Sequence, residues 1–386
     1  MKKKALMACC NYWDSPFHVG SHHIAKNLLE LGWQVGFVSD PISLLHVCKG
    51  LTDDLKKRSE SFFSGGCWDE SHNLYTWVPG AIVTPTNKFG LDGRWLHYNW
   101  HKLSVPNVIN KIKQEGFGKV DLLYIDSKYQ SFWLNKIQYR KSIFRVADKN
   151  DEFSSSAKIT NEIENYIASK ADCVVYSAST LSEYVSEMKP NDSFHLANGV
   201  NFNHFYYGDH DLPNDLKFVP APRIIYVGAM AEWFDFECMI RIAKKMQDVS
   251  FVFIGDNESL NIEEKLPTNM FFLGKKTYRE LPSYLHNSNV GIIPFNVEKY
   301  PGLVNNINPL KLYEYMSVGL PVVSTYWEEL NNLKSPAYLY KNQEEAIFYI
   351  RKALNEKTTL KEKYIKYARN NTWKSKVKNL VEYLSL

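Results

Sequence analysis

The stretch NPLKLYEYMSVGLPVV, residues 308–323, gives the clearest structural signal in the sequence. Asn308 is a residue type that caps helices, and proline is favoured at the first helical position, so a helix is expected to begin at Pro309. Gly319 is suited to end that helix, because glycine readily adopts the left-handed conformation found just after a helix. The apolar residues that follow predict a buried strand over 321–324. The stretch therefore predicts one repeat of an alternating α/β fold.

Two charged residues near the start of this helix point to a binding site. Backbone N–H groups at a helix start lack helical partners and carry the positive end of the helix dipole, which suits phosphate. Lys311, in the first turn, can add an ammonium group to the same phosphate. Glu314, three residues later, lies on the same face and can accept hydrogen bonds from ribose hydroxyls. The arrangement favours a nucleoside diphosphate site. Composition leaves one alternative open, which is an amphipathic helix whose Lys and Glu are solvated.

Strands and helices alternate on either side of this stretch. The expected strands are 5–10, 33–39, 120–125, 142–146, 172–177, 223–227, 250–254, 270–273, 290–294 and 321–324. The expected helices include 22–31, 159–171, 236–247, 278–287 and 309–318. Because helices separate the strands, the sheets should be parallel and covered on both faces. We therefore expect an α/β protein with two Rossmann-like domains facing a cleft, whose ligands bind beyond the carboxyl ends of the strands.

The polar stretch after residue 200, which is rich in Gly and Pro, predicts the domain boundary. The expected parts are an N-terminal domain over 1–200, a linker over 201–222, a C-terminal domain over 223–365 and a closing helix over 366–386. Residues 50–105 are rich in Trp, Gly and His and give no clear periodicity.

Composition narrows the class of protein. The 386 residues fit two domains, and 45% hydrophobic with 23% charged residues is typical of a soluble globular chain. The apolar run Ala5–Cys10 is too short for a membrane span and has no cleavage site after it, so a strand is expected rather than a signal peptide. A net charge of +4 from 46 basic and 42 acidic residues argues against a nucleic-acid partner. Six cysteines without a CxxC pair indicate free thiols in a reducing cytoplasm.

Several segments, taken in order, resemble the GT-B glycosyltransferases. Residues 308–323 are similar to the signature PLKLYEYMAAGKPVV of that superfamily. The other resembling segments are 171–177, 198–200, 224–230, 272–285 and 289–295. The resemblance is to bacterial enzymes that build extracellular or wall polysaccharide, such as the xanthan glucuronosyltransferase and the teichuronic-acid transferases.

This resemblance implies a glycosyltransferase that moves a hexosyl or uronosyl group from a nucleoside diphosphate sugar, expected to be UDP-linked, to a bacterial glycan or lipid-linked saccharide. It implies no metal and no cofactor. Gly228 and Met230 would line the donor cleft, Lys311 would hold the diphosphate, Glu314 would bind the ribose, and Tyr300 would be a further donor contact. A UDP-N-acetylglucosamine 2-epimerase type of isomerase and a non-catalytic sugar-nucleotide-binding subunit stay open as alternatives.

One position departs from the pattern of the retaining enzymes in this group. They carry a first glutamate eight residues before the ribose-binding one, and here Asn306 stands eight residues before Glu314. An inverting enzyme needs a general base in the N-terminal domain. The segment FRVAD, ending at Asp148, resembles the strand end that carries this base, so Asp148 is the expected base, with Asp126 and Asp151 as competitors. A loop-capping aspartate is the structural alternative.

Basic residues gather toward the C-terminus, at Lys361, Lys363, Lys366, Arg369, Lys374, Lys376 and Lys378. A solvated helix face explains them, and contact with an anionic membrane surface is the alternative, because clustered lysines bind such surfaces. We expect a cytoplasmic protein, with association at the inner face of the cell membrane as that alternative.

Overall fold

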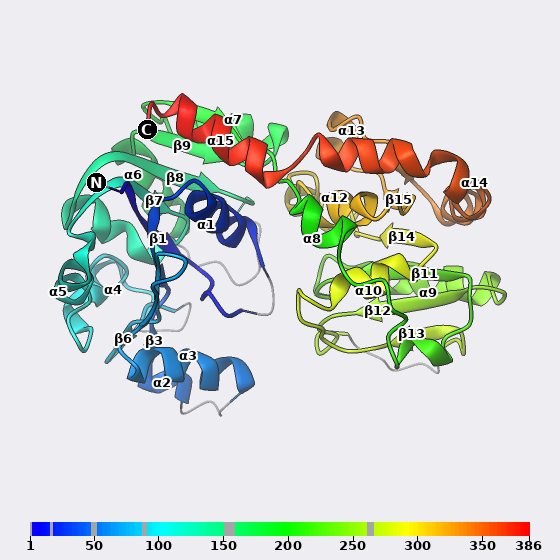
Figure 1. Ribbon diagram of the computed structural model, residues 1–386, viewed down its shortest axis with the longest axis horizontal. Helices are drawn as coiled ribbons and strands as arrows, with labels where there is room; N and C mark the ends of the chain where they lie inside the picture. The colour runs from blue at the N-terminus through cyan, green and yellow to red at the C-terminus, as the bar shows by residue number, and fades with distance from the viewer. Residues whose placement is uncertain (1, 16–17, 48–51, 87–90, 150–158, 261–265) are drawn as a thin grey trace. The chain divides into compact units, whose positions relative to one another are not determined.

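Figure 1 shows the computed structural model of the chain, which describes residues 2–15, 18–47, 52–86, 91–149, 159–260 and 266–386. The chain forms two compact units. Unit 1 consists of Met1–Ala197 together with Val377–Leu386, and unit 2 consists of Asn198–Lys376. The residues 201–222, which were expected to form a linker, are therefore counted with unit 2.

Unit 1 is built on an eight-stranded sheet in the order β10-β9-β8-β7-β1-β2-β5-β4, parallel except for the edge strand β4. Its strands are β1 (Lys4–Cys9), β2 (Gln34–Ser39), β4 (Cys67–Asp69), β5 (Leu74–Trp77), β7 (Lys119–Ile125), β8 (Gln138–Val146), β9 (Cys173–Tyr176) and β10 (Ser193–His195). The chain runs outward from β1 in one direction and from β7 in the other, so the strand order reverses between these two strands. Ligands of such sheets bind at this reversal, beyond the carboxyl ends of the strands.

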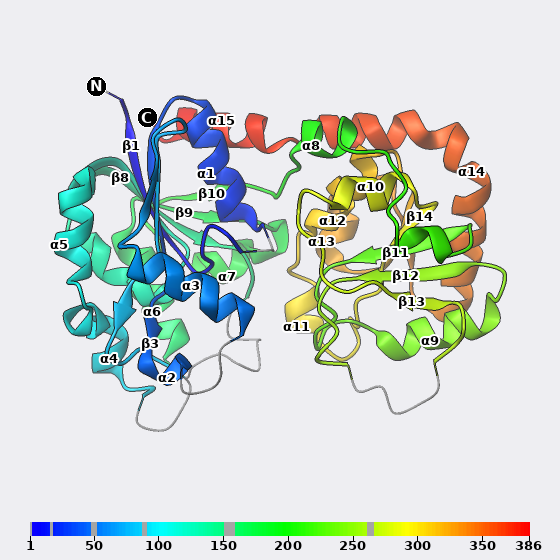
Figure 2. The ribbon, with the colours of Figure 1, turned by 60° about the horizontal axis from the view of Figure 1, so that its bottom comes forward.

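Helices cover both faces of this sheet. The helix α1 packs against β2, and α5 lies on the opposite side of the sheet (Figure 2). The helices of unit 1 are α1 (Gly20–Glu30), α2 (Leu44–Val47), α3 (Asp53–Phe63), α4 (Arg94–Asn99), α5 (Val108–Ile112), α6 (Thr160–Lys170) and α7 (Ser182–Glu187). Residues 50–105, where periodicity gave no prediction, hold β4, β5, α3, α4 and β6 (Gly80–Ala81), which pairs with β3 (Ile42–Ser43).

Unit 2 is built on a six-stranded parallel sheet in the order β13-β12-β11-β14-β15-β16. Its strands are β11 (Arg223–Val227), β12 (Ser250–Ile254), β13 (Met270–Phe272), β14 (Val290–Ile293), β15 (Val322–Thr325) and β16 (Tyr338–Tyr340). Its helices are α8 (Phe202–Tyr206), α9 (Phe236–Lys245), α10 (Leu281–His286), α11 (Pro301–Val304), α12 (Leu310–Ser317), α13 (Glu328–Asn332) and α14 (Gln343–Arg369). The strand order reverses between β11 and β14, and the chain leaves β14 through α11 and then enters α12. Both sheets are therefore doubly wound, which confirms the expected fold class for each unit.

The C-terminal helical stretch is divided rather than continuous. The helix α14 ends at Arg369, and α15 (Trp373–Tyr383) begins after a short break. At the break, Val200 N–H donates to Asn371 O at 3.0 Å and Trp373 N–H donates to Val200 O at 3.1 Å. These backbone bonds replace helical ones, which explains why a single closing helix over 366–386 does not form.

The last part of α15 packs on the edge of the unit 1 sheet. The ring of Tyr383 lies 4.4 Å from the ring of Phe194, centroid to centroid, and its hydroxyl donates to the Asp192 carboxylate at 2.8 Å. Arg140 donates from Nη2 to Ser385 O at 2.8 Å. The fold of unit 1 therefore uses residues from both ends of the chain. No helix in the described part of the chain is both long enough and apolar enough to cross a bilayer.

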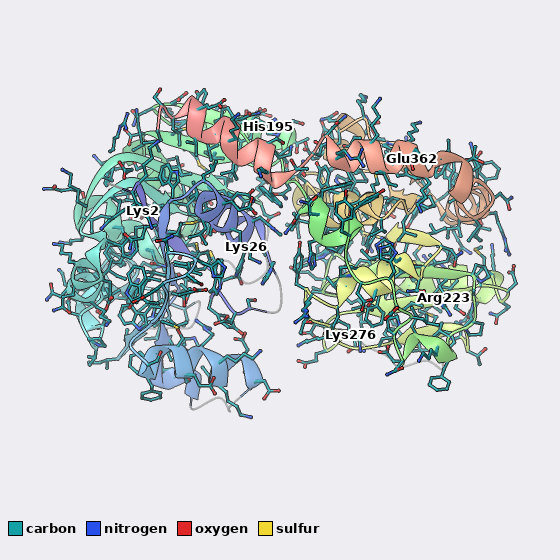
Figure 3. The ribbon with its side chains drawn as sticks, in the orientation of Figure 1. Lys2, Lys26, His195, Arg223, Lys276 and Glu362 are labelled. Atoms are coloured by element: carbon teal, nitrogen blue, oxygen red, sulfur yellow. The ribbon has the colours of Figure 1, made fainter. Side chains whose placement is uncertain are left out.

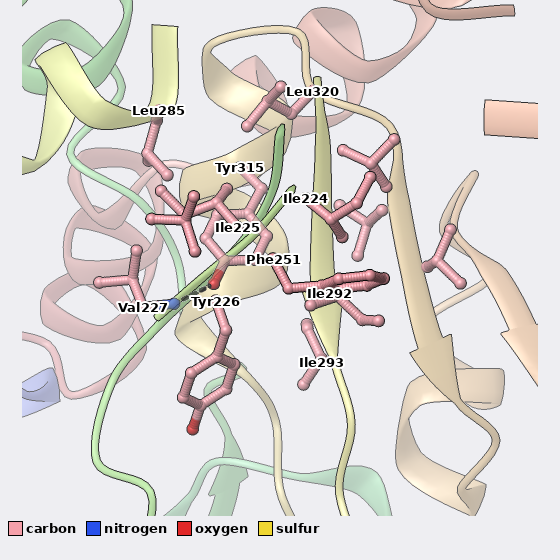
Figure 4. Close-up of a cluster of buried hydrophobic side chains, with 14 of the residues drawn as sticks. Ile224, Ile225, Tyr226, Val227, Phe251, Leu285, Ile292, Ile293, Tyr315 and Leu320 are labelled. Carbon is pink, nitrogen blue, oxygen red and sulfur yellow. Dashed lines mark hydrogen bonds between the residues drawn. The ribbon is translucent and has the colours of Figure 1, made fainter. Parts of the chain in front are cut away.

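A tyrosine from α12 joins this helix to the central strand of unit 2 (Figure 4). The fully buried side chain of Tyr315 accepts a hydrogen bond from Val227 N–H at 2.8 Å, where β11 ends. A Cβ atom at Gly291 in β14 would overlap the Tyr315 ring, so glycine at this position makes room for it. Together these contacts hold α12 against the end of β11 and beside β14.

We expect Tyr315→Phe to lower the free energy of unfolding by ~1–3 kcal/mol, because it leaves the buried Val227 N–H without its acceptor. Urea denaturation followed by circular dichroism measures the effect. The control is Tyr207→Phe, which alters a tyrosine that is 73% exposed in the same unit. Equal stabilities of the two variants would contradict this role of Tyr315.

Candidate functional site

The turn after β11 brings Gly228 against Lys311. Gly228 has a φ of 142°, in the region that favours glycine, and its N–H donates to Ile254 O at 2.8 Å. A Cβ atom at this position would lie 2.6 Å from Lys311 Cε and 2.7 Å from Lys311 Nζ. Any larger residue would displace the lysine, so the glycine allows the ammonium group to lie directly over the backbone after β11.

The Lys311 ammonium group lies between two aromatic faces. Its Nζ is 5.3 Å from the centroid of the Tyr226 ring and 5.6 Å from that of Phe295. Burial lowers the pKa of Lys311, and the nearby Glu314 carboxylate acts in the opposite direction. Cation–π contacts offset part of the cost of burying this charge, but an anionic ligand would offset more of it.

Glu314 lies one turn along α12 on the same face as Lys311. Burial raises the pKa of the Glu314 carboxyl group to about 7, and Lys311 acts in the opposite direction.

Burial raises the pKa of Tyr278 well above its usual range, and the charge of Glu314 adds to this effect. The helix expected to start at Tyr278 begins instead at Leu281, which leaves Tyr278 in the preceding loop, where His204 stacks on its ring at 4.3 Å.

The expectation that Asn308 caps α12 is wrong. The helix begins at Leu310, and its capping position is Pro309, which makes no side-chain cap. Asn308 is buried, donates from Nδ2 to Glu329 Oε1 at 2.9 Å, and accepts from the Tyr313 hydroxyl at 3.0 Å. Because these tertiary partners use the amide, the start of α12 has no side-chain cap at the edge of the sheet.

The other two expected donor residues are placed differently. Met230 is 1% exposed, and its side chain belongs to the core of unit 2, while its N–H donates to Asp256 O at 2.8 Å. Tyr300 precedes α11 and is half-buried, with Lys299 Nζ 5.3 Å from its ring centroid. None of the contacts described for these two residues joins them to Lys311, whereas Gly228, Lys311 and Glu314 come together.

In unit 1, carboxylates follow three of the four central strands at their carboxyl ends. Asp126, after β7, accepts hydrogen bonds from Cys10 N–H at 2.8 Å, from the Ser21 hydroxyl and from the Tyr124 hydroxyl at 3.3 Å. Asp148, two residues after β8, is half-buried, and burial raises its pKa while the neighbouring Arg145 acts in the opposite direction. Asp126 already serves as an acceptor for three groups, so Asp148 is better suited to take a proton. The third competitor, Asp151, lies outside the described residues.

Sequence reasoning missed a carboxylate at the end of β2. Asp40 accepts hydrogen bonds from the Ser127 hydroxyl and from Gln130 Nε2, the latter at 3.4 Å. Burial raises its pKa to about 7, and Asp126 contributes in the same direction. The signal was present, because Asp40 follows an apolar run after a single serine, much as Asp126 follows its apolar run.

Comparisons with known proteins agree with this architecture. Residues 7–177 match the family model described as the N-terminal domain of the glucuronosyltransferase GumK, and residues 221–354 match glycosyl transferases group 1. TuaH of Bacillus subtilis (strain 168), whose name assigns it to teichuronic acid biosynthesis as a glycosyltransferase, is 25% identical over 245 residues. That match covers 59% of this chain and 60% of TuaH, so the chain spans less than two thirds of this curated relative.

Solved structures with the same fold cover nearly the whole chain. Sucrose-phosphate synthase from Thermosynechococcus elongatus superimposes with a TM-score of 0.70 at 14% identity, over 99% of this chain and 98% of that one. HepE from Anabaena, solved in complex with UDP and glucose, gives a TM-score of 0.63 at 13% identity over 100% of both chains. At these identities the likeness shows the fold.

We expect Asp40→Asn to gain stability relative to the unaltered protein as the pH rises from about 4 to about 7. The raised pKa means that ionising Asp40 costs more free energy in the folded chain than in the unfolded chain. The unaltered protein therefore loses stability across this pH window. The uncharged amide of the variant avoids that loss. Urea midpoints at pH 4.5 and pH 7.5 measure it, with the exposed Asp92→Asn as control. A difference in midpoint that does not change with pH would contradict the burial of the charge.

Proposed function

We propose that the chain, whose two units match glycosyltransferase family models and whose fold is that of GT-B enzymes, transfers a sugar from a UDP-sugar to a hydroxyl group of a bacterial surface glycan or a lipid-linked saccharide. The observation that carries this proposal is the contact of Lys311 with Gly228 at the start of α12. Surface polysaccharide synthesis is the proposed context, since TuaH is named for teichuronic acid biosynthesis.

The donor diphosphate would lie at the start of α12. Backbone N–H groups there have no side-chain cap, and the Lys311 ammonium group lies within one turn of them. Both are fixed before the ligand arrives, so they can neutralise the charge that develops on the leaving UDP without reorganising. This route to charge neutralisation requires no metal. HepE, which has the same fold, was solved with UDP-glucose, which supports the choice of UDP.

Glu314 would bind the ribose. Its carboxylate shares a helix face with Lys311 and is half-buried, which makes it a strong acceptor for two adjacent hydroxyl groups. Hydroxyl donors would favour the ionised carboxylate, and a bound diphosphate would favour the charged ammonium group of Lys311. Donor binding would therefore stabilise the charged forms of both residues.

Asp148 would act as the general base that deprotonates the acceptor hydroxyl. Its position after a buried strand and its raised pKa suit a group that must take a proton near neutral pH. Asn306 stands where retaining relatives carry a carboxylate, and the absence of that carboxylate supports transfer with inversion. The acceptor oxygen would attack the anomeric carbon as UDP leaves.

A lipid-linked acceptor would bring the protein to the inner face of the membrane. Exposed basic side chains of α14 and α15, among them Lys361, Lys363, Lys366, Arg369 and Lys374, would meet anionic head groups there.

Lys311→Ala is expected to weaken UDP binding by ~1.5–3 kcal/mol, because it removes a charge-assisted contact with the diphosphate. Titration calorimetry with UDP measures this loss. Lys363→Ala, an exposed lysine on α14, is the matched control and should bind UDP like the unaltered protein. Unchanged affinity in Lys311→Ala would remove this lysine from the site.

Asp148→Asn is expected to bind UDP normally and to lose transfer, since an amide cannot accept the acceptor proton at neutral pH. Release of UDP from UDP-sugar donors with membrane-extracted lipid-linked saccharides measures turnover, with the exposed Asp53→Asn as control. Full turnover in Asp148→Asn would assign the base to another residue. Steady UDP release that depends on an acceptor separates transfer from epimerisation, and UDP binding with no turnover would favour a non-catalytic subunit.

A further inference from the structure

A hollow in unit 1 lies away from the carboxyl ends of the strands. It has a volume of about 270 Å³ and is lined by Gln34, Trp68, Glu70 and Asn73. Gln34 is the first residue of β2, and Asn73 immediately precedes β5, so the hollow lies at the amino ends of these parallel strands. A strand of six residues spans about 20 Å, so the hollow is separate from Asp148 at the opposite edge.

The strand register explains why Gln34 and Trp68 lie on one face of the sheet. Trp68 pairs with Tyr75, and Tyr75 pairs with Gly36, so these three residues share one face of the sheet. Side chains two residues apart along an extended strand lie on the same face. Gln34 lies two residues before Gly36 within β2, so its side chain is directed to the same face as Trp68. Glu70 and Asn73 lie in the turn that joins β4 to β5, where Asn73 has a φ of 57°, and they complete the lining.

The indole ring of Trp68 is fixed in place before any ligand binds. It stacks on Phe117 with 5.8 Å between centroids and 13° between planes, and it lies 5.3 Å from the Tyr75 ring. Its Nε1 donates to Glu115 Oε2 at 2.6 Å, and Lys111 Nζ pairs with Glu115 Oε1 at 2.7 Å. Because the indole N–H already has its acceptor, the part of the ring that lines the hollow offers apolar surface.

The polar groups around this ring are two amides and a carboxylate. Gln34 and Asn73 can donate and accept hydrogen bonds, and Glu70 accepts them, which matches neighbouring hydroxyl groups that do both. Lys2, labelled in Figure 3, donates from Nζ to Asn73 Oδ1 at 2.7 Å and fixes the orientation of that amide. An apolar platform beside mixed amide and carboxylate groups suits a pyranose ring, which has an apolar C–H face and a rim of hydroxyl groups.

We propose that this hollow binds one sugar unit of a polysaccharide chain, as a carbohydrate-holding site remote from the proposed donor site. Its volume lies below the ~300–1,000 Å³ of pockets that bury drug-sized ligands, which fits a single ring with the rest of the chain left in solvent. Such a site raises the local concentration of a glycan near the protein without taking part in transfer. It requires neither UDP nor turnover.

Affinity electrophoresis in native gels containing dextran, xylan or mixed-linkage β-glucan tests this proposal. We expect at least one of the three polysaccharides to retard the full-length protein. Trp68→Ala should weaken that retardation about tenfold, because it removes the aromatic platform. Trp95→Ala, which alters a tryptophan that is 57% exposed in the same unit, should leave it unchanged. No retardation in any gel, or full retardation of Trp68→Ala, would overturn the proposal.

A second variant guards against loss of folding in Trp68→Ala. Gln34→Ala combined with Glu70→Ala alters only side chains at the rim of the hollow and should also lose retardation. Calorimetry with UDP should give the same affinity for these variants as for the unaltered protein, so the outcome is independent of the proposed transfer activity. Retardation that survives in the double variant would exclude this hollow as the site.

Discussion

The hydrogen bond from Val227 N–H to the Tyr315 hydroxyl determines where the donor half of the proposed site can form. It joins α12 to the end of β11, in addition to the core packing of Leu312 and Met316, and Lys311 on the same helix lies over Gly228. Two glycines make the arrangement sterically possible, Gly291 under the Tyr315 ring and Gly228 under the lysine. The charged group at the site thus depends on a neutral, fully buried contact about one helical turn away.

The sequence predicted the parts of the fold that rest on local patterns. The strands over 223–227 and 250–254 were predicted to the residue, because apolar runs and turn residues mark both of their ends. The region 50–105 was not predicted, since its strands are two to four residues long and are stabilised by partners distant in sequence. The cap of α12 was also mispredicted. The side-chain amide of Asn308 forms hydrogen bonds with Glu329 and Tyr313, and neither residue is adjacent to Asn308 in sequence.

For the site, the sequence indicated which residues carry charge but not how their environments differ. Asp40, Asp126 and Asp148 all follow apolar strands, and nothing in their local sequence ranks them. Asp126 is distinguished by hydrogen bonds that it accepts in the folded chain. Two of their donors lie at the start of α1 and in the residue after β1, more than a hundred positions away in sequence. Burial then distinguishes the remaining two carboxyl groups from ordinary surface aspartates. Proximity of this kind arises only when the sheet is assembled.

Unit 1 is discontinuous, since its sheet edge at β10 is packed by residues that come last in the chain. During synthesis, the ribosome releases all strands of this sheet long before Tyr383 emerges. Phe194 and Asp192 at this edge therefore lack their Tyr383 partner until the whole of unit 2 has been translated. A chain that stops before residue 377 would lack these contacts, so unit 1 would never complete its packing at this edge.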